Sequence, residues 1–313
     1  MVERDALKAV LLLAGVALAA CSPPADEAGE GREPEPTPSV GWDVVQDSSQ
    51  RVGAIEGLSG PESVRYDPDQ DVWFVSNWDG DGEARDANGF VSRVSAETGQ
   101  VETLRFAQGT AEHPLHAPRG MFLVGDTLWV ADIDGVHGFD RRSGEPVAFV
   151  DLTSFEPGFL NDVVQGPDGA LYLTDTGKST VYRIAGREVT IALADTVLGN
   201  PNGITWDAAR EELVMVPWDP GFRVHTWRPG ESPQGFGLTS TPGRMDGIEP
   251  YGRRLLMASQ SDSSIVLMDA GETWLVIKVP GRPADIGVDT RRGRIAVPYV
   301  DLDRVDVWAL PPR

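Results

Sequence analysis

Six short motifs share one pattern, and five of them carry a polar side chain at the same position, where these side chains could together hold a metal ion. Each motif has an apolar or proline residue, a second residue that is polar in all but the sixth motif, a third residue and an apolar one. The motifs are PESV (61–64), PRGM (118–121), LNDV (160–163), PNGI (201–204), MDGI (245–248) and PADI (283–286). The second positions hold Glu62, Arg119, Asn161, Asn202, Asp246 and Ala284, and the third hold Ser63, Gly120, Asp162, Gly203, Gly247 and Asp285.

The second positions include two carboxylates and two carboxamides, which are hard oxygen ligands. Such ligands suit Ca²⁺, Mg²⁺ or Mn²⁺ better than softer ions. Without a cation, Glu62 and Asp246 would repel each other in a confined site. The alternative is that these side chains only hydrogen-bond backbone groups where strands begin. Because four of them share one register position, we predict one divalent cation, with Ca²⁺ favoured and Mg²⁺, Mn²⁺ or Zn²⁺ as alternatives.

Each motif opens a repeat of roughly forty residues that contains several short strands. A second strand follows the motif, as in VWFVSN (72–77) and LYLTDT (171–176), and third and fourth strands follow that one. Four short strands in about 40 residues are typical of a propeller blade. We therefore predict an all-β, six-bladed β-propeller with four-stranded antiparallel blades, whose innermost strands turn the six second positions toward a central channel.

The last repeat ends soon after its third strand. We predict that GWDVVQD (41–47) supplies the missing outer strand, so that an N-terminal strand closes the ring and removes exposed sheet edges. Two β-sandwiches would not explain six similar repeats. A parallel α/β sheet would need crossover helices for which the repeats have no room.

Asn161 and Asp162 are poor strand residues placed at the start of a strand. The repeat directs Asn161 toward the channel beside Glu62, Asn202 and Asp246, at the edge of the predicted metal. Asp162 has two interpretations: a proton carrier in catalysis, or a brace for its neighbour.

Four motifs, GPESV, FLNDVVQGPDGALYLTDT, NPNGITWD and MDGIE, resemble those of the gluconolactonase/regucalcin family of six-bladed propellers. The resemblance covers roughly residues 57 to 300. It implies one divalent cation held by Glu62, Asn202 and Asp246, with Asn161 contacting the ion or the substrate. It also implies hydrolysis of a lactone, with Asp246 as ligand and general base and Asp162 as a weaker candidate for the base.

One residue departs from the family pattern. Members that act on sugar lactones have an arginine two residues before the Asn161 position, where this chain has Phe159. Arg119, on the neighbouring blade, is our candidate to bind substrate together with Asn161. The departure keeps a second hypothesis open, in which a non-catalytic propeller binds a small ligand or a protein partner around a structural metal.

The N-terminus has the pattern of a bacterial lipoprotein. An apolar run from Ala9 to Ala20 is too short to span a bilayer but fits a signal peptide. LAAC (18–21) resembles a lipobox, which implies a signal peptide over residues 1–20 and acylation of Cys21, the only cysteine. Residues 21–40 are rich in Pro, Glu and Gly and predict a disordered tether, followed by the propeller over 41–313.

The net charge and the motifs that fail to match restrict the classes of partner that we expect. The net charge of −21 disfavours nucleic acid. LTDTGKST (173–180) imitates a phosphate-binding loop, but Tyr172 stands where that motif needs glycine, so we expect no nucleotide. His113 and His116 form a weak zinc signal without further ligands. We expect a monomer, anchored by lipid in the bacterial cell envelope, with a small-molecule ligand or substrate.

Overall fold

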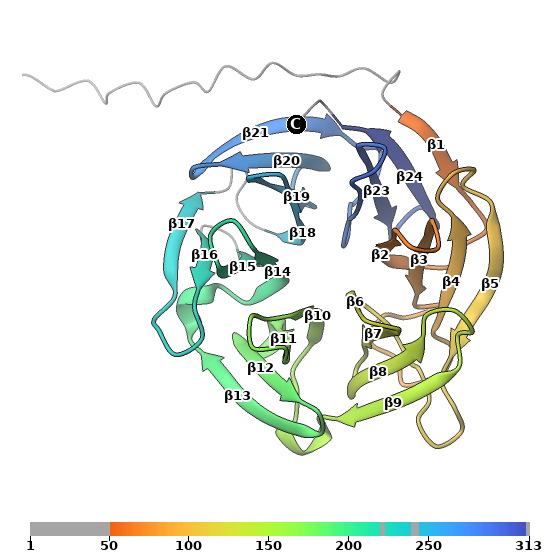
Figure 1. The fold of residues 1–313 in the computed structure, drawn as a ribbon, viewed down its shortest axis with the longest axis horizontal. Helices are drawn as coiled ribbons and strands as arrows, with labels where there is room; N and C mark the ends of the chain where they lie inside the picture. The colour runs from red at the N-terminus through yellow and green to blue at the C-terminus, as the bar shows by residue number, and fades with distance from the viewer. Residues whose placement is uncertain (1–50, 220–222, 239–243, 311–313) are drawn as a thin grey trace, which may run out of the picture. The chain divides into compact units, whose positions relative to one another are not determined.

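The computed structural model describes residues 51–219, 223–238 and 244–310, all within one compact unit, Gly41–Arg313. Its strands form six separate four-stranded antiparallel sheets arranged as a ring (Figure 1). Within these described residues, three short 3-10 helices, η2 (Thr153–Phe155), η3 (Thr176–Lys178) and η4 (Thr196–Leu198), join some of the strands. In the described ranges, no helix has the length and apolar character needed to cross a membrane.

The predicted all-β, six-bladed propeller is confirmed. Blades 1 to 3 are β2 (Pro61–Asp67), β3 (Val72–Asn77), β4 (Phe90–Ser95), β5 (Val101–Gln108); β6 (Met121–Val124), β7 (Thr127–Ala131), β8 (Gly135–Asp140), β9 (Pro146–Asp151); and β10 (Leu160–Gln165), β11 (Leu171–Asp175), β12 (Thr180–Ala185), β13 (Glu188–Ala194). Blades 4 to 6 are β14 (Pro201–Asp207), β15 (Glu212–Pro217), β16 (Arg223–Trp227), β17 (Gln234–Leu238); β18 (Met245–Tyr251), β19 (Arg254–Ser259), β20 (Ser264–Asp269), β21 (Glu272–Lys278); and β22 (Gly287–Asp289), β23 (Arg294–Tyr299), β24 (Arg304–Ala309), β1 (Arg51–Ile55).

An N-terminal strand closes the ring, as predicted. It is β1, which pairs antiparallel with β24 and becomes the outer strand of blade 6. The segment predicted for this role, 41–47, lies outside the described residues. Because the last blade takes strands from both ends of the chain, no blade lacks its outer strand.

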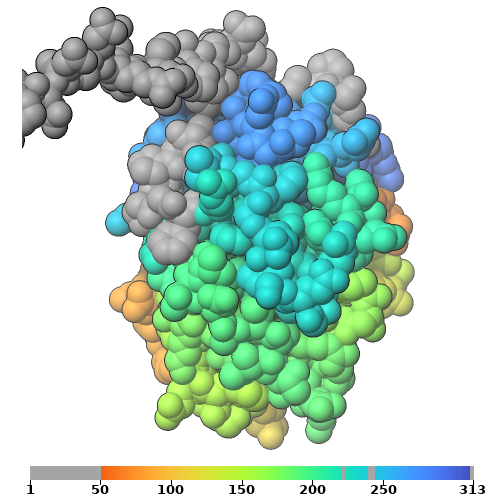
Figure 2. All heavy atoms as spheres, turned by 90° about the vertical axis from the view of Figure 1, so that its left-hand side faces the viewer, coloured from red at the N-terminus to blue at the C-terminus, as the bar shows by residue number. Residues whose placement is uncertain are grey.

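The core lies between neighbouring blades. Trp73 and Val75 of blade 1 pack with Val305 of blade 6, and all three are almost fully buried. Tyr172 of blade 3 meets Trp227 of blade 4 edge to face, with ring centroids 5.9 Å apart. Burying side chains of this size contributes about 1.5–3 kcal/mol each. From the side, the outer edges of blades 3 to 5 follow one another in sequence order, from green to blue (Figure 2).

Backbone hydrogen bonds join the inner strands around the channel. Asp285 donates its N–H to the carbonyl of Glu62 at 2.9 Å, and its own carbonyl accepts from Val64 at 3.1 Å. Gly120 donates to the carbonyl of Asn161 at 3.0 Å. A Cβ on Gly120 would lie 2.2 Å from Oδ1 of Asp162, so only glycine permits this approach between blades 2 and 3.

Candidate metal centre and ligand cavity

A β-bulge places the polar motif residues in four of the six inner strands. The pairing register with the second strand breaks between Pro61 and Val64, Leu160 and Val163, Pro201 and Ile204, and Met245 and Ile248. The second and third motif positions fall inside each break. A bulge removes residues from the ladder and redirects their side chains. This explains why Asn and Asp are acceptable here, although they are poor strand formers.

Hydroxyl groups of the second strands satisfy backbone groups that the bulges release. The N–H of Asp162 donates to Oγ1 of Thr174 at 3.0 Å, and the N–H of Ser63 donates to Oγ of Ser76 at 2.9 Å. Buried backbone donors need such partners. The bulges are therefore built into blades 1 and 3 by their own second strands.

A cavity of about 350 Å³ lies at these bulges. Glu62, Asn161, Asn202 and Asp246, the four residues predicted to bind the metal, all line it. They come from blades 1, 3, 4 and 5 and are each at most 4% exposed. The structure thus brings together four residues that are far apart in the sequence, at the place where repeat registration predicts them.

Besides the four bulge residues, the cavity is lined by five residues that were not predicted. Each of these five directly follows the end of a second strand; they are Trp78, Thr176, Trp218, Gln260 and Val300. The same registration, applied to this position instead of the motif, would have found them. The other lining residues are Glu83, Phe159, Arg282 and Ala284.

Hydrogen bonds fix the polar groups and leave specific oxygens for a ligand. Nδ2 of Asn161 donates to Oγ1 of Thr176 at 3.1 Å, so the amide oxygen of Asn161 remains for the cavity. Gln260 donates to Oδ2 of Asp246 at 2.7 Å. Oδ1 of Asp246 and Oε2 of Glu62 are buried without a partner in the described part of the chain. Buried carboxylate oxygens without partners are costly unless an ion or a ligand meets them.

Burial and mutual repulsion shift these carboxyls strongly. Burial raises the pKa of Glu62 well above its usual range, and Asp246 and Asp285 raise it further, while Arg119 opposes the shift. Burial, helped by Asp285, raises the pKa of Asp246 to about 8 against the hydrogen bonds from Gln260 and Asn202. A cation would favour the ionised forms and reverse these shifts.

The inner strands carry more acidic than basic groups at this site. Electrostatic interactions connect five carboxyls with one another; they are Glu62, Asp162, Asp246, Glu249 and Asp285. Arg65 interacts with Asp162, Glu249 and Asp285, and Arg119 interacts with Glu62. Arg65 forms an ion pair with Glu249 and donates from Nε to the carbonyl of Met121 at 2.7 Å. The carboxyls exceed the guanidinium groups by three, so the channel suits a cation.

Arg119 does not line the cavity. Its side chain donates to the carbonyls of Leu160 at 3.0 Å and Gly82 at 2.6 Å, while Nε has no partner among the described residues. The guanidinium lies over the ring of Phe159, 3.8 Å from its centroid, and Phe159 does line the cavity. The aromatic ring thus stands between the cavity and the cation that we had expected to bind substrate.

Asp162 braces two blades. Its Oδ1 accepts from the N–H of Val163 at 2.7 Å, and its Oδ2 accepts from the N–H of Ile204 on blade 4 at 2.8 Å. Asp285, at the same motif position in blade 6, accepts from the hydroxyl of Ser63 on blade 1. We predicted either a proton carrier or a brace for the neighbouring Asn161; these contacts join Asp162 to Val163 and to Ile204 of the next blade instead.

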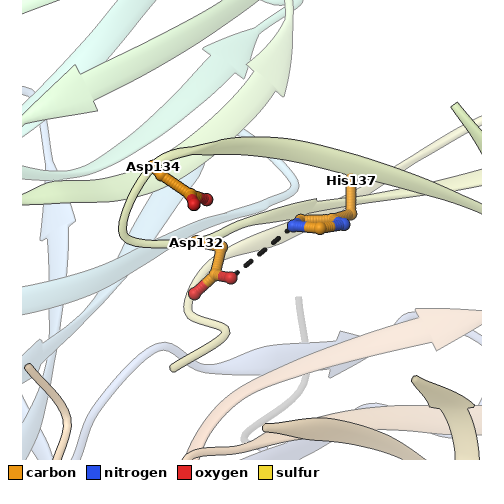
Figure 3. Close-up of side chains that lie close together, drawn as sticks. All are labelled: Asp132, Asp134 and His137. Atoms are coloured by element: carbon orange, nitrogen blue, oxygen red, sulfur yellow. Dashed lines mark ion pairs between the residues drawn. The ribbon is translucent and has the colours of Figure 1, made fainter. Parts of the chain in front are cut away.

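A second group of potential metal ligands lies in blade 2, away from the cavity lining. Ligand atoms of Asp132, Asp134 and His137 all lie within 4.8 Å of one another, which makes a possible metal site (Figure 3). Nε2 of His137 is 3.6 Å from Oδ2 of Asp132. The nearby His116 accepts the N–H of Ala87 on Nδ1, so a neutral His116 carries its proton on Nε2 and offers no free ligand nitrogen.

In blades 2 and 3, an aspartate directly after or at the end of the second strand accepts two backbone N–H groups from the loop before the motif, and blade 3 does so without a histidine at the matching position. Asp132 accepts the N–H groups of His116 and Ala117, each at 2.7 Å. Asp175 likewise accepts from Gly158 at 2.9 Å and Phe159 at 2.8 Å, and the hydroxyl of Tyr182 approaches it at 3.3 Å.

Tyr182 occupies the strand position of His137. In blade 1, Asn77 accepts from the N–H of Ser59 and donates to Ser92 at the same position. We call this contact between the end of a second strand and the loop before the motif the blade bracket. The bracket explains the backbone partners of Asp132, whereas Nε2 of His137 and Oδ1 of Asp134 are buried without a partner in the described part of the chain, so these three residues stay a possible metal site.

Comparison with known proteins supports the fold. No protein-family model and no curated protein sequence matches the chain. Among solved structures, a gluconolactonase from Xanthomonas campestris matches with a TM-score of 0.62 and 17% identity, over 84% of this chain and 92% of that one. Regucalcin from Agrobacterium tumefaciens, a calcium-binding protein, matches with a TM-score of 0.62 and 19% identity, over 83% and 94%.

A third group of similar structures has a different activity. Catalytically inactive virginiamycin B lyase from Staphylococcus aureus, solved with quinupristin, matches with a TM-score of 0.57 and 15% identity, over 83% of this chain and 99% of that one. At such low identities, the TM-scores show a shared fold and no more. Because one fold hosts several activities, the function has to be argued from the site.

Proposed function

We propose that this chain is a divalent-metal-dependent hydrolase of a lactone or related ester, with the metal in the central cavity. The observation that carries the proposal is the pair of buried, unpartnered oxygens, Oε2 of Glu62 and Oδ1 of Asp246. They line one cavity with the amides of Asn161 and Asn202. This donor set fits Ca²⁺ or Mg²⁺, with Mn²⁺ and Zn²⁺ as alternatives. The calcium-binding regucalcin, which shares the fold, makes Ca²⁺ the first choice.

A divalent cation at these residues would polarise a substrate carbonyl and lower the pKa of water. The chain itself supplies the acid–base group. Gln260 holds Oδ2 of Asp246 and leaves Oδ1 for the cavity, so the carboxylate that would bind the metal would also be the group that takes a proton from the attacking water. Thr176 fixes the amide of Asn161 so that its oxygen faces the ligand. Trp218 and Phe159 exclude bulk water from the same space.

The histidines argue against a lyase of the virginiamycin type. The inactive variant of that lyase has a histidine replaced by alanine. The histidines of this chain are His113, His116, His137 and His225, and none of them lines the cavity. Asp246 is the better-placed proton acceptor, which favours hydrolysis.

A second candidate function is binding without catalysis, around a structural metal. It is favoured by one observation: Arg119 is engaged by two backbone carbonyls and covered by Phe159, so the substrate contact we expected from it is missing. In this case the protein would bind a small ligand or a protein partner and would catalyse no reaction.

The test is a panel of lactones and aryl esters, assayed after chelation and again with each of the four ions. Hydrolysis should require an ion and fall by more than about 100-fold in Asp246→Asn and Glu62→Gln, since outer-shell partners of metals alone change activity 10- to 100-fold. Asp269→Asn, on an exposed strand end, is the matched control. A metal-bound protein that leaves the whole panel intact would support the binding function instead.

We also propose that the mature protein is held in the bacterial cell envelope by acylation of Cys21. The support is the LAAC sequence after an apolar run, followed by a Pro- and Glu-rich tether. The anchor would face the periplasm, from either membrane, or the cell surface. It would keep the propeller at a membrane without a spanning helix.

A further inference from the structure

Apart from two exposed charged residues, the polar side chains of the cavity are the bulge residues and two side chains bonded to them. Glu62, Asn161, Asn202 and Asp246 lie in the bulges, and Thr176 and Gln260 are bonded to two of them. The remaining wall is apolar or aromatic: Trp78, Phe159, Trp218, Ala284 and Val300. Sugar hydroxyls buried against such a wall would lose hydrogen bonds with water and gain none.

The two remaining charged lining residues, Glu83 and Arg282, do not change this contrast. Both are exposed, so they lie at the mouth of the cavity. Arg282 also faces Asp301, with its Nε 3.7 Å from Oδ2. A ligand inside the cavity therefore meets charge at the metal residues and at the entrance, with apolar surface between.

Arg119, an internal cation beside Phe159, does not line the cavity. It is 1% exposed, its donors reach Leu160 and Gly82, and its face is covered by Phe159. The two nitrogens that donate to the carbonyls of Leu160 and Gly82 are not available to bind ligand hydroxyls or a ligand carboxylate.

Trp78 adds one isolated donor to the apolar wall. Its Nε1–H is buried and unpartnered within the described chain. Gly82 packs on the indole so closely that a Cβ there would lie 2.6 Å from ring carbons, which holds the loop after Trp78 against the cavity. A single N–H in an apolar wall suits a ligand with one acceptor at that point.

From these observations we propose that the cavity takes a lactone or ester with an apolar alkyl or aryl body, and discriminates against polyhydroxylated sugar lactones. This deepens the proposed function and rests on it for the nature of the reacting group. The carbonyl lies at the bulge residues, and the apolar body contacts Trp218, Phe159 and Val300. A site that buries apolar surface rejects the hydroxylated analogue because its hydroxyl groups stay unpaired.

The test measures binding apart from turnover. Two δ-lactams, which resist hydrolysis, serve as probes: one carries a hexyl chain and the other carries ring hydroxyls and a hydroxymethyl group. Titration calorimetry of the full mature chain in saturating Ca²⁺ should give at least about tenfold tighter binding of the hexyl lactam. Equal or tighter binding of the hydroxylated lactam, or no binding of either, would overturn the proposal.

Variants locate the effect. Trp218→Ala should weaken binding of the hexyl lactam about tenfold, whereas Trp274→Ala, on the outer strand β21, should leave it unchanged. Val300→Asn should narrow the preference between the two lactams, and it provides a second measurement if Trp218→Ala folds poorly. If the preference is unchanged in Trp218→Ala and Val300→Asn, the apolar wall does not set it.

The two proposals can fail separately. Tight binding of the hexyl lactam with no hydrolysis of any lactone would remove the proposed activity and leave the ligand class standing. Hydrolysis with a preference for sugar lactones would remove the ligand class alone.

Discussion

Asp162 on the inner strand of blade 3 accepts a 2.8 Å hydrogen bond from the backbone nitrogen of Ile204 on the inner strand of blade 4. Its other oxygen accepts from Val163. Asp162→Ala leaves both buried N–H groups unsatisfied, at about 1–3 kcal/mol each. We expect urea unfolding to show a loss of about 2–4 kcal/mol, with calcium affinity changed less than in Asp246→Ala.

Asp269→Ala is the control, because Asp269 and its partner Arg254 are each about 40% exposed. An exposed pair of this kind contributes at most about 1 kcal/mol. If Asp162→Ala kept wild-type stability but lost metal-dependent hydrolysis, Asp162 would be a proton carrier and the bracing interpretation would be wrong.

Calcium should stabilise the folded protein through Glu62 and Asp246. At a concentration of 100 times its Kd, a ligand specific for the folded state adds about 2.7 kcal/mol. We expect chelation to lower Tm and Ca²⁺ to restore it, with elemental analysis giving about one ion per chain. Glu62→Gln should abolish the response, and exposed Glu97→Gln should not. A wild type whose melting ignores both chelator and calcium would contradict the metal centre.

Stability of the metal-free protein should fall as the pH rises. The pKa of Asp246 is about 8 in the folded chain against 3.8 for an unperturbed aspartate. Between these values the folded state binds more protons than the unfolded state, so the free energy of unfolding decreases with pH. We expect a loss of at least about 2 kcal/mol between pH 5 and pH 8, since one pKa unit corresponds to about 1.4 kcal/mol.

Saturating calcium should flatten this profile because the bound ion replaces the protons, and Asp246→Asn should flatten it in part. Urea titrations at four pH values provide the measurement. Metal-free protein that is more stable at pH 8 than at pH 5 would show that Asp246 is ionised without an ion.

His137→Tyr separates the blade bracket from a second metal site. Blade 3 has Tyr182 at this position, with its hydroxyl 3.3 Å from Asp175. The variant should therefore fold, with a loss of about 1–3 kcal/mol, the usual cost of enlarging a buried side chain. Zinc and calcium stoichiometry should not change. Loss of one bound ion on this substitution would establish Asp132, Asp134 and His137 as a metal site.

Cys21→Ser should release the protein from the membrane fraction, since acylation needs the thiol. Fractionation of cells, followed by detergent partition, measures the change, and Ser22→Ala serves as the matched control. If Cys21→Ser remained in the membrane fraction, the proposed lipid anchor would be excluded.

The fold was predictable because six similar repeats support the same strand assignment, even where a single segment could be read in more than one way. A single segment such as PADI says little, and in blade 6 the inner strand is indeed short, with β22 starting only at Gly287. Six similar units with turn residues between them restrict the fold to a ring. The identity of the closing strand could not be predicted in the same way, because β1 belongs to no repeat and its pairing with β24 depends on tertiary contact.

The site was predictable only along the register of the repeat. Glu62, Asn161, Asn202 and Asp246 share a motif position, and they share a cavity. Arg119 shares that position too, but its side chain contacts Leu160, Gly82 and Phe159. These partners are distant in the sequence, so the motif position alone could not predict them. Trp78 and Trp218 were missed because they do not stand at the motif position, and a tryptophan is equally suited to the core between blades.

The bulges separate two tasks between adjacent residues, and this bears on how such a protein can change over time. Where both positions are polar, as at Asn161 and Asp162, the first faces the cavity while the second bonds to the neighbouring blade. A substitution at the first position can therefore alter chemistry without loosening the ring. A lineage that keeps its second residues can explore new reactions one residue at a time, and a randomised library restricted to Asn161, Asn202, Gln260 and Trp218 should retain mostly folded members.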